Sequence, residues 1–184
     1  MNCRRESAVS GSAKTPLRGL DYLDKTVYNI GMNILKSGIP DNRPILVEWQ
    51  ERYSVGIPKI DEQHKELLRL TNELYASCLK DNDEEEKAHF KKTISALVNY
   101  VSEHFAAEER LLKRVDYPEY AAHRSEHTGF VKKVLEQVTE FNEGKNFAPN
   151  SFVRYLKDWI LGHIAVSDKR YSEYIFALKK QGKI

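Results

Sequence analysis

The chain has 184 residues, enough for one domain of ordinary size with an appendage. Hydrophobic residues make up 41% of it and charged residues 30%, and the formal net charge is +2, so overall charge favours neither nucleic acid nor a lipid surface as a partner. No run approaches the roughly 20 apolar residues that a membrane span needs. The two cysteines, Cys3 and Cys78, belong to no CxxC pair. We therefore expect a reduced, cytoplasmic protein without a disulfide framework or a thiolate metal site.

The N-terminal part, residues 1–44, is predicted to be an extension of a main domain that spans residues 45–184. It begins with a tail rich in Ser, Gly and Ala, typical of a flexible segment and without the apolar run of a secretory signal. Apolar residues at helical spacing then predict an amphipathic helix over residues 20–36: Leu20, Leu23, Val27, Ile30 and Ile34. One helix cannot bury its own apolar stripe, so it must pack on the main domain, on a protein partner or on a second copy.

Four longer helical patterns follow the Gly- and Pro-containing break "SGIPDNRPI". The first runs from about Asp61, a candidate N-cap, to Lys80. The second follows the acidic turn "KDNDEEEK" and ends at "VDYP", and the third begins near Pro118 and stops at "NEGKN". The fourth begins near Asn150 or Ser151. No strand pattern competes, and the short connections predict an all-α, antiparallel up-down-up-down four-helix bundle.

Histidine interrupts the apolar stripe of every one of these helices, and the second stripe also contains a glutamate. Each interruption falls at a step of three or four residues, so these side chains point inward with the leucines and phenylalanines. Burial of an unpaired, ionised carboxylate costs several kcal/mol or more, and a buried imidazole also needs a partner. A bound cation would compensate both, because it replaces the lost solvent. The pattern therefore indicates a metal site inside the bundle.

The spacing of these residues fits chelation. "HFAAE" places His104 and Glu108 at i and i+4, and "HRSEH" does the same for two further histidines, His123 and His127. Such pairs lie on one helix face, roughly 6 Å apart along the axis. His64 adds a single imidazole from "DEQH".

The fourth helix offers a different spacing, because "HIAVSD" separates His163 from Asp168 by five positions. In a regular α-helix five residues turn through about 140°. We therefore expect these two side chains to approach a shared site from different flanks, as one terminal and one bridging ligand.

The complete set contains five imidazoles and two carboxylates, more than one metal ion takes from a protein. Two metal ions joined by two carboxylates would use all seven. Imidazole mixed with carboxylate suits iron, and zinc, copper and manganese are less well matched. No thiolate is present in the set, so an iron–sulfur cluster is not indicated.

This set of motifs resembles the hemerythrin family, and within it the bacterial hemerythrins. The matching segments are "IDEQHKEL", "HFAAEE", "HRSEH" and "HIAVSD", together with the lead-in "EWQERYSVGIPKIDEQH", and the resemblance extends from about Leu46 to Lys180. It implies a non-haem di-iron centre with an oxo or hydroxo bridge and reversible binding of dioxygen for storage, delivery or buffering. No nucleic acid or membrane partner is implied.

The resemblance also implies a role for each ligand. His123, His127 and His163 would bind one iron, His64 and His104 would bind the other, and Glu108 and Asp168 would bridge the two. Dioxygen would bind at the iron with fewer histidines. Ile160 and Ile164, one turn from the ligands on the fourth helix, and Leu111, one turn past Glu108, are expected to keep this site dry.

Some of these residues also permit other interpretations. His89 forms an ExxH pair with Glu86, as ferritin-like di-iron oxidases use, but a second such pair is missing, so His89 is predicted to lie on the surface. Tyr171 is predicted to contribute to packing. An oxygen-sensing regulatory domain and a di-iron oxidase or iron-centre repair protein remain as alternatives. The five imidazoles favour reversible binding over an enzyme, because additional carboxylate favours high-valent iron.

Overall fold

The computed structural model describes residues 44–79, 84–145 and 147–184. The helix predicted over residues 20–36 lies outside the described residues. In the described part, three long helices are α2 (Pro58–Ser77), α3 (Glu84–Arg114) and α4 (Tyr120–Asn142). A fourth rod consists of α5 (Pro149–His163), the short segment η2 (Ile164–Asp168) and α6 (Lys169–Lys180), which follow one another without a break.

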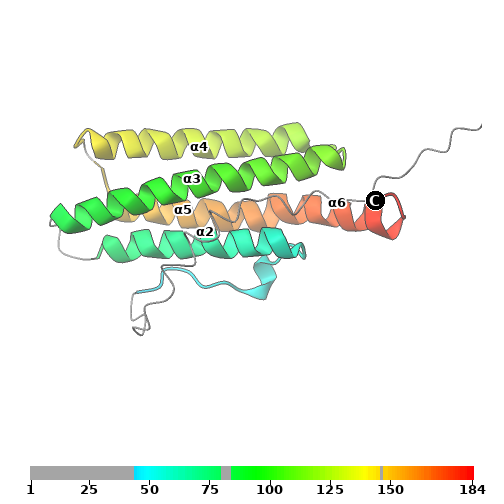
Figure 1. Cartoon of the computed structure of the whole chain (residues 1–184), viewed down its shortest axis with the longest axis horizontal. Coiled ribbons are helices and arrows are strands. Elements are labelled where there is room, and N and C mark those ends of the chain that lie inside the picture. Colours follow the sequence, from blue (N-terminus) through cyan, green and yellow to red (C-terminus); the bar gives the residue numbers. More distant parts are fainter. Residues whose placement is uncertain (1–43, 80–83, 146) are drawn as a thin grey trace, which may run out of the picture. The chain divides into compact units, whose positions relative to one another are not determined.

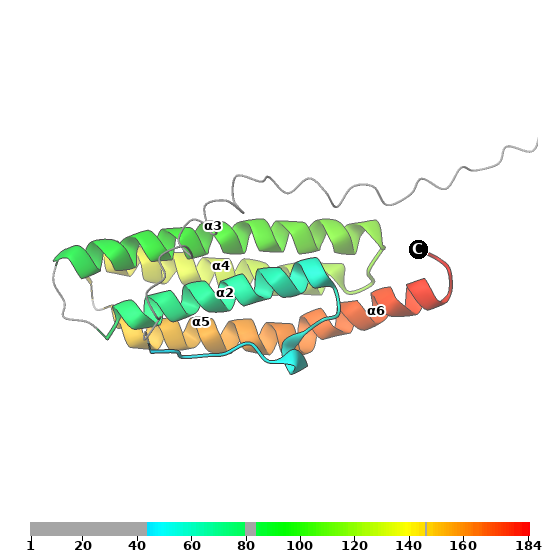
Figure 2. The ribbon, with the colours of Figure 1, turned by 60° about the horizontal axis from the view of Figure 1, so that its bottom comes forward.

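The four rods lie side by side along one axis, as two views of the ribbon show (Figures 1 and 2). The described residues contain no strand. The predicted all-α four-helix bundle is therefore confirmed. Among the described helices, none combines the length with the apolar composition that a membrane span requires.

The start of α2 differs from the prediction. The helix begins at Pro58, whose fixed φ suits a first helical position, and Asp61 lies inside the first turn instead of capping it. The Asp61 carboxylate accepts hydrogen bonds from the Val55 backbone N–H at 2.7 Å and from Ser54 Oγ at 2.6 Å. It therefore fastens the preceding segment, which contains the short helix η1 (Glu51–Tyr53), to the beginning of α2.

The turn between α3 and α4 contains the predicted Asp-Tyr-Pro sequence. Asp116 has a φ of 49°, in the left-handed region that aspartate tolerates better than most residues. After Pro118 only Glu119, the N-cap, precedes the start of α4 at Tyr120. This tight turn makes α3 and α4 antiparallel neighbours.

The apolar core consists of two clusters. The large apolar cluster extends over all four rods and includes Leu74, Leu97, Phe130 and Leu156. The small apolar cluster consists of buried residues from the end of α3, the following turn and α6: Leu112, Val115, Tyr117, Tyr171 and Ile175. On α3 Glu108, and on the last rod Asp168, stand between residues of the two clusters, so apolar packing lies on both sides of the site along both rods.

Candidate metal centre

All seven predicted ligands are buried, and His163, the most accessible of them, is only 6% exposed. Each rod supplies at least one: α2 carries His64, α3 carries His104 and Glu108, α4 carries His123 and His127, and the last rod carries His163 and Asp168. The structure thus brings together seven side chains that lie up to 104 residues apart in the sequence, from 64 to 168.

Six of the seven side chains supply potential ligand atoms to two sets. Within each set the atoms lie within 4.8 Å of one another. The three-histidine set consists of Glu108, His123, His127 and His163, and the two-histidine set consists of His64, His104 and Glu108. This division is the one that the resemblance implied, and Glu108 is the member that the two sets share.

Asp168 also contacts both sets, with one oxygen toward each. Its Oδ2 lies 3.2 Å from His64 Nε2 in the two-histidine set. Its Oδ1 lies 3.2 Å from His163 Nε2 and 3.8 Å from His123 Nε2 in the three-histidine set. Glu108 and Asp168 therefore occupy the position between the two sets that a bridging carboxylate requires.

The contact between His163 and Asp168 arises from an unusual piece of backbone. Residues 164–168 form the π-helical segment η2, in which hydrogen bonds join residues five apart. Two residues five apart therefore lie nearly above one another, instead of about 140° apart as in a regular α-helix. The expectation that His163 and Asp168 reach the site from different flanks was wrong, because the helix is locally widened at this point.

Several of the potential ligand atoms have no hydrogen-bond partner. Six buried atoms in the described residues have none: both ring nitrogens of His64, Nε2 of His123, Oε2 of Glu108 and both carboxylate oxygens of Asp168. Buried polar atoms are almost always paired, so such a concentration needs an explanation. Imidazole nitrogens and carboxylate oxygens that face one another in a dry interior are a donor set for iron. The residues present therefore fit a di-iron group.

The electrostatics of the site favour positive charge. Burial alone would lower the pKa of His64, but the Asp168 and Glu108 carboxylates beside it outweigh burial and raise that pKa to about 9. Burial opposes ionisation of both carboxyl groups, yet the surrounding imidazoles hold the pKa of Glu108 and of Asp168 below the usual range. The two acids are thus ionised and attract a cation.

His104 behaves differently from His64. Burial lowers its pKa to about 4, and the nearby Glu108 carboxylate offsets only part of that effect. Its imidazole is neutral at physiological pH, which is the form that binds a metal ion.

Three of the imidazoles are held from behind by side chains that the sequence analysis did not single out. Each Nδ1 has an oxygen partner: Gln63 Oε1 at 3.2 Å from His104, Glu109 Oε1 at 3.3 Å from His127, and Glu126 Oε2 at 2.8 Å from His163. Such partners orient a metal-binding imidazole and fix its tautomer. All three stand directly beside a predicted ligand in the sequence, which is the signal that could have found them.

Tyr171 has a role that its sequence pattern did not reveal. It is completely buried in the small apolar cluster, as predicted for packing, but its hydroxyl also donates a 2.5 Å hydrogen bond to Glu108 Oε1. The tyrosine therefore holds the carboxylate that the two sets share. His89 is exposed on α3, as predicted.

A small cavity adjoins the site. Its lining combines His64, His104, His163 and Asp168 with apolar side chains: Leu67, Val101, Phe105, Phe130, Trp159, Ile160 and Ile164. The volume is about 10 Å³, room for about one water-sized molecule. Ile160 and Ile164 thus lie where the sequence analysis expected them. Leu111 does not, because it is half-buried against the small apolar cluster.

Aromatic rings complete the walls of this cavity. The Phe105 ring is stacked on the His127 imidazole with centroids 3.7 Å apart, and the Trp159 ring is stacked on His163 at 4.5 Å. Both stacks oppose tilting of the imidazole about its χ2 bond, because tilting would separate the stacked rings. Phe105 is a residue that the helical spacing did not indicate, because it directly follows His104.

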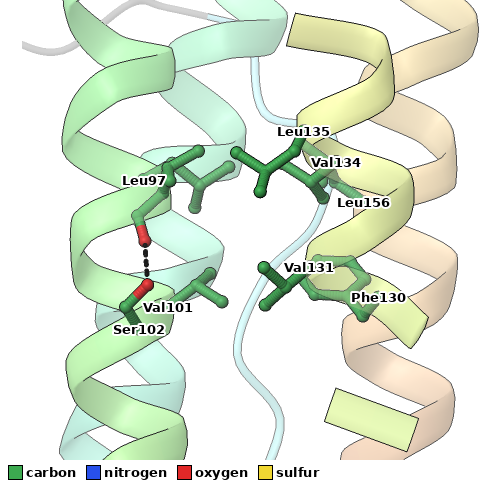
Figure 3. Close-up of a pocket in the computed structure, with 9 residues that line it drawn as sticks. Leu97, Val101, Ser102, Phe130, Val131, Val134, Leu135 and Leu156 are labelled. Carbon is green, nitrogen blue, oxygen red and sulfur yellow. Dashed lines mark hydrogen bonds between the residues drawn. The ribbon is translucent and has the colours of Figure 1, made fainter. Parts of the chain in front are cut away.

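A second pocket lies next to this cavity, between α3 and α4 (Figure 3). It is lined by apolar side chains of the two helices, with Leu156 from α5 and only Ser102 contributing a polar group. Val101 and Phe130 line both the pocket and the cavity. The apolar lining therefore continues from the site to the face of the bundle where Leu135 is 48% exposed.

Comparisons with known proteins agree with this geometry. The family model described as the hemerythrin HHE cation binding domain matches residues 55–175. A bacteriohemerythrin of Stenotrophomonas maltophilia is 30% identical over 132 residues, which are 72% of this chain and 83% of that protein. A bacteriohemerythrin of Methylococcus capsulatus is 28% identical over 72% of this chain and 98% of its own length.

Solved structures give the same result. A crystal structure of wild-type hemerythrin superimposes with a TM-score of 0.65 at 27% identity, and the match covers 70% of this chain and 96% of that one. The matched family region contains all seven converging side chains. The chain therefore belongs to the hemerythrin family of cation-binding domains.

Proposed function

We propose that the protein holds two iron ions and binds dioxygen reversibly, as a store, carrier or buffer of oxygen. Its metal ligands are His64, His104, Glu108, His123, His127, His163 and Asp168. The observation that carries the proposal is the presence of Glu108 in both sets of ligand atoms, with Asp168 in contact with both as well. Two carboxylates shared by two groups of imidazoles are the arrangement that a pair of ions requires.

The iron pair supplies the electrons that reversible dioxygen binding needs, and the chain supplies the surroundings. Glu108 and Asp168 hold the two positions together, and Tyr171 keeps Glu108 in place through its hydrogen bond. Ile160 and Ile164 exclude water from the cavity. Exclusion of water matters because water and protons promote the loss of reduced oxygen, which would leave the iron oxidised.

The cavity supports a position for dioxygen beside the two-histidine set. It is lined by both His64 and His104, but His163 is the only histidine of the three-histidine set that contributes. The two-histidine set also offers one nitrogen ligand fewer, so an ion held by His64 and His104 would have room for a further ligand. A small apolar molecule would fit the remaining walls, which are almost entirely hydrocarbon.

The test is the optical spectrum of the iron-loaded protein, recorded alternately under air and argon. We expect two iron ions per chain and a charge-transfer band that disappears under argon and returns with air. Irreversible bleaching after the first exposure would contradict reversible binding and favour oxidase chemistry. A chain that takes up no iron would contradict the proposal as a whole.

A non-enzymatic role and a cytoplasmic location are parts of the same proposal. The five-imidazole donor set supports the first, because oxidases of this kind use more carboxylate to stabilise high-valent iron. Turnover of peroxide or of an added reductant by the iron-loaded protein would contradict it.

A sensing role is the second candidate, and the amphipathic pattern of residues 20–36 is the observation that favours it. In that case the segment would communicate the oxygenated state to a protein partner or to a second copy. Removal of residues 1–44 separates the two functions. A shortened chain with unchanged oxygen affinity and oligomeric state would contradict the sensing role.

A further inference from the structure

Glu126 connects two rods directly beside the candidate centre. It lies on α4 within the "HRSEH" segment, and its Oε2 accepts a hydrogen bond from Ser167 Oγ at 2.6 Å and lies 2.8 Å from His163 Nδ1. Both partners belong to the last rod, His163 at the end of α5 and Ser167 within the π-helical segment η2. One carboxylate oxygen therefore binds the ligand imidazole and the widened turn that follows it.

The contacts of the second ring nitrogen, Nε2, show which edge of the His163 imidazole faces the other ligands. Nε2 faces the cluster, 3.0 Å from His127 Nε2 and 3.2 Å from Asp168 Oδ1. A metal ion bound at Nε2 requires that nitrogen to be free of a proton, so the remaining proton must be on Nδ1. Nδ1 points at Glu126, whose carboxylate can only accept.

This contact differs from the comparable one on His127. Glu109 lies 3.3 Å from His127 Nδ1 and also pairs with Arg124 Nε at 3.5 Å, so its charge is shared. The shorter contact of Glu126 with His163, reinforced by Ser167, is the stronger of the two. A carboxylate behind an imidazole makes that imidazole a better electron donor to its metal ion.

We infer that Glu126 is a positioning residue of the metal centre, which holds the His163 imidazole with its proton on Nδ1 and presents Nε2 to the ion of the three-histidine set. Ser167 fixes the carboxylate in the orientation that this requires. The inference rests on the proposed function in one respect only, since it assumes that His163 binds a metal ion. It assigns Glu126 a task that its half-exposed position, at 45%, would otherwise not suggest.

The experiment compares Glu126→Ala, Glu126→Gln and Ser167→Ala with the control Glu136→Gln. Glu136 also lies on α4 and is 48% exposed, but its partner is Lys133 at 3.8 Å, away from the ligands. Ferrous iron is loaded without oxygen, and its transfer to a coloured chelator is followed over time. Glu126→Ala should release iron about 10–100-fold faster than the unaltered protein. Glu126→Gln, whose amide oxygen still accepts, should show a smaller increase, and Glu136→Gln none.

Mössbauer spectra of the same samples distinguish positioning from a general loosening of the bundle. The signal of one of the two irons should change in Glu126→Ala, while that of the other stays close to the original. Iron release at the unaltered rate, or an equal change in both signals, would overturn the inference.

A further measurement keeps the inference separate from the proposed function. In zinc-loaded protein with nitrogen-15-labelled histidine, NMR should find the His163 proton on Nδ1, and Glu126→Ala should shift that resonance. A proton on Nε2 would overturn the inference even in a protein that binds iron. The expected result in a chain that binds zinc but takes up no iron would uphold the role of Glu126 and overturn only the proposed function.

Discussion

The large apolar cluster and the candidate metal centre lie on the same helical stripes, but burial affects the free energy of folding in opposite directions in the two regions. Around Leu97 and Leu156, burial of hydrocarbon stabilises the bundle by roughly 25 cal/mol for each Å² removed from water. About two and three turns further along α3, burial of His104 and Glu108 costs free energy unless the polar atoms gain partners. Burial in the first region contributes stability without any ligand, whereas burial in the second costs free energy that a bound cation would offset.

This difference explains why a site with six unpartnered polar atoms can exist inside the bundle. The apolar clusters supply the stability that holds the four rods in register, and the ligands then have little freedom to turn away from one another. We therefore expect the apolar clusters to hold the fold without metal and the ligand layer between them to depend on bound metal. Changes in the two regions should therefore affect different measurements.

Glu108→Ala should have the largest effect, because it removes the carboxylate that both sets share. We expect the purified variant to lose most of its iron, as measured by elemental analysis. The matched control is His89→Ala, on the same helix but exposed, which should retain the iron of the unaltered protein. Full iron content in Glu108→Ala would show that the shared carboxylate is not a ligand.

Leu97→Ala should produce the reverse pattern. Leu97 is 1% exposed in the large apolar cluster, so its truncation leaves a cavity. The free energy of unfolding should fall by about 2–5 kcal/mol in a denaturant titration, while the iron content per folded chain stays unchanged. A loss of iron in this variant would mean that the two regions are not independent.

Tyr171→Phe tests the place where the two regions meet. The change leaves the packing of the ring intact but removes the donor to Glu108, which should destabilise the iron-loaded protein by about 1–3 kcal/mol and accelerate iron release. Tyr174→Phe is the control, since its hydroxyl makes only 3.3 Å contacts with the backbone oxygens of Val115 and Asp116. If the two variants had equal stability and equal rates of iron release, Tyr171 would contribute through packing alone.

Ile164→Ser should have the smallest effect on iron content, although truncation of this buried side chain also lowers the free energy of unfolding. It tests the role of the apolar wall. Ile164 is 1% exposed and lines the cavity beside the ligands. A hydroxyl there admits water, so autoxidation, followed by the decay of the oxygenated absorption band, should be several-fold faster. Val166→Ser, in the same π-helical segment but 55% exposed, should leave that rate unaltered.

The sequence predicts a site residue correctly where one side chain and its helical spacing are sufficient. The i and i+4 pairs on α3 and α4 converge because a regular helix places such residues on one face, whatever surrounds it. The sequence does not predict a residue's role correctly where contacts with a neighbouring element determine the local backbone conformation. Asp61 is not a cap, because the chain before α2 folds back and uses its carboxylate. Leu111 is displaced from the site, and its neighbour Leu112 is the fully buried one.

The sequence by itself determined the helical class, the burial of histidine and carboxylate among apolar residues, and the family to which their spacing is similar. Only the tertiary structure decided the widened turn between His163 and Asp168, and the partners that hold the imidazoles and Glu108 from behind. The physical reason is the separation along the sequence of the residues that make contact. Helical periodicity is a property of consecutive residues, whereas the contacts of Glu126 with Ser167 and of Tyr171 with Glu108 join residues 41 and 63 positions apart. Such contacts form only after the rods have packed.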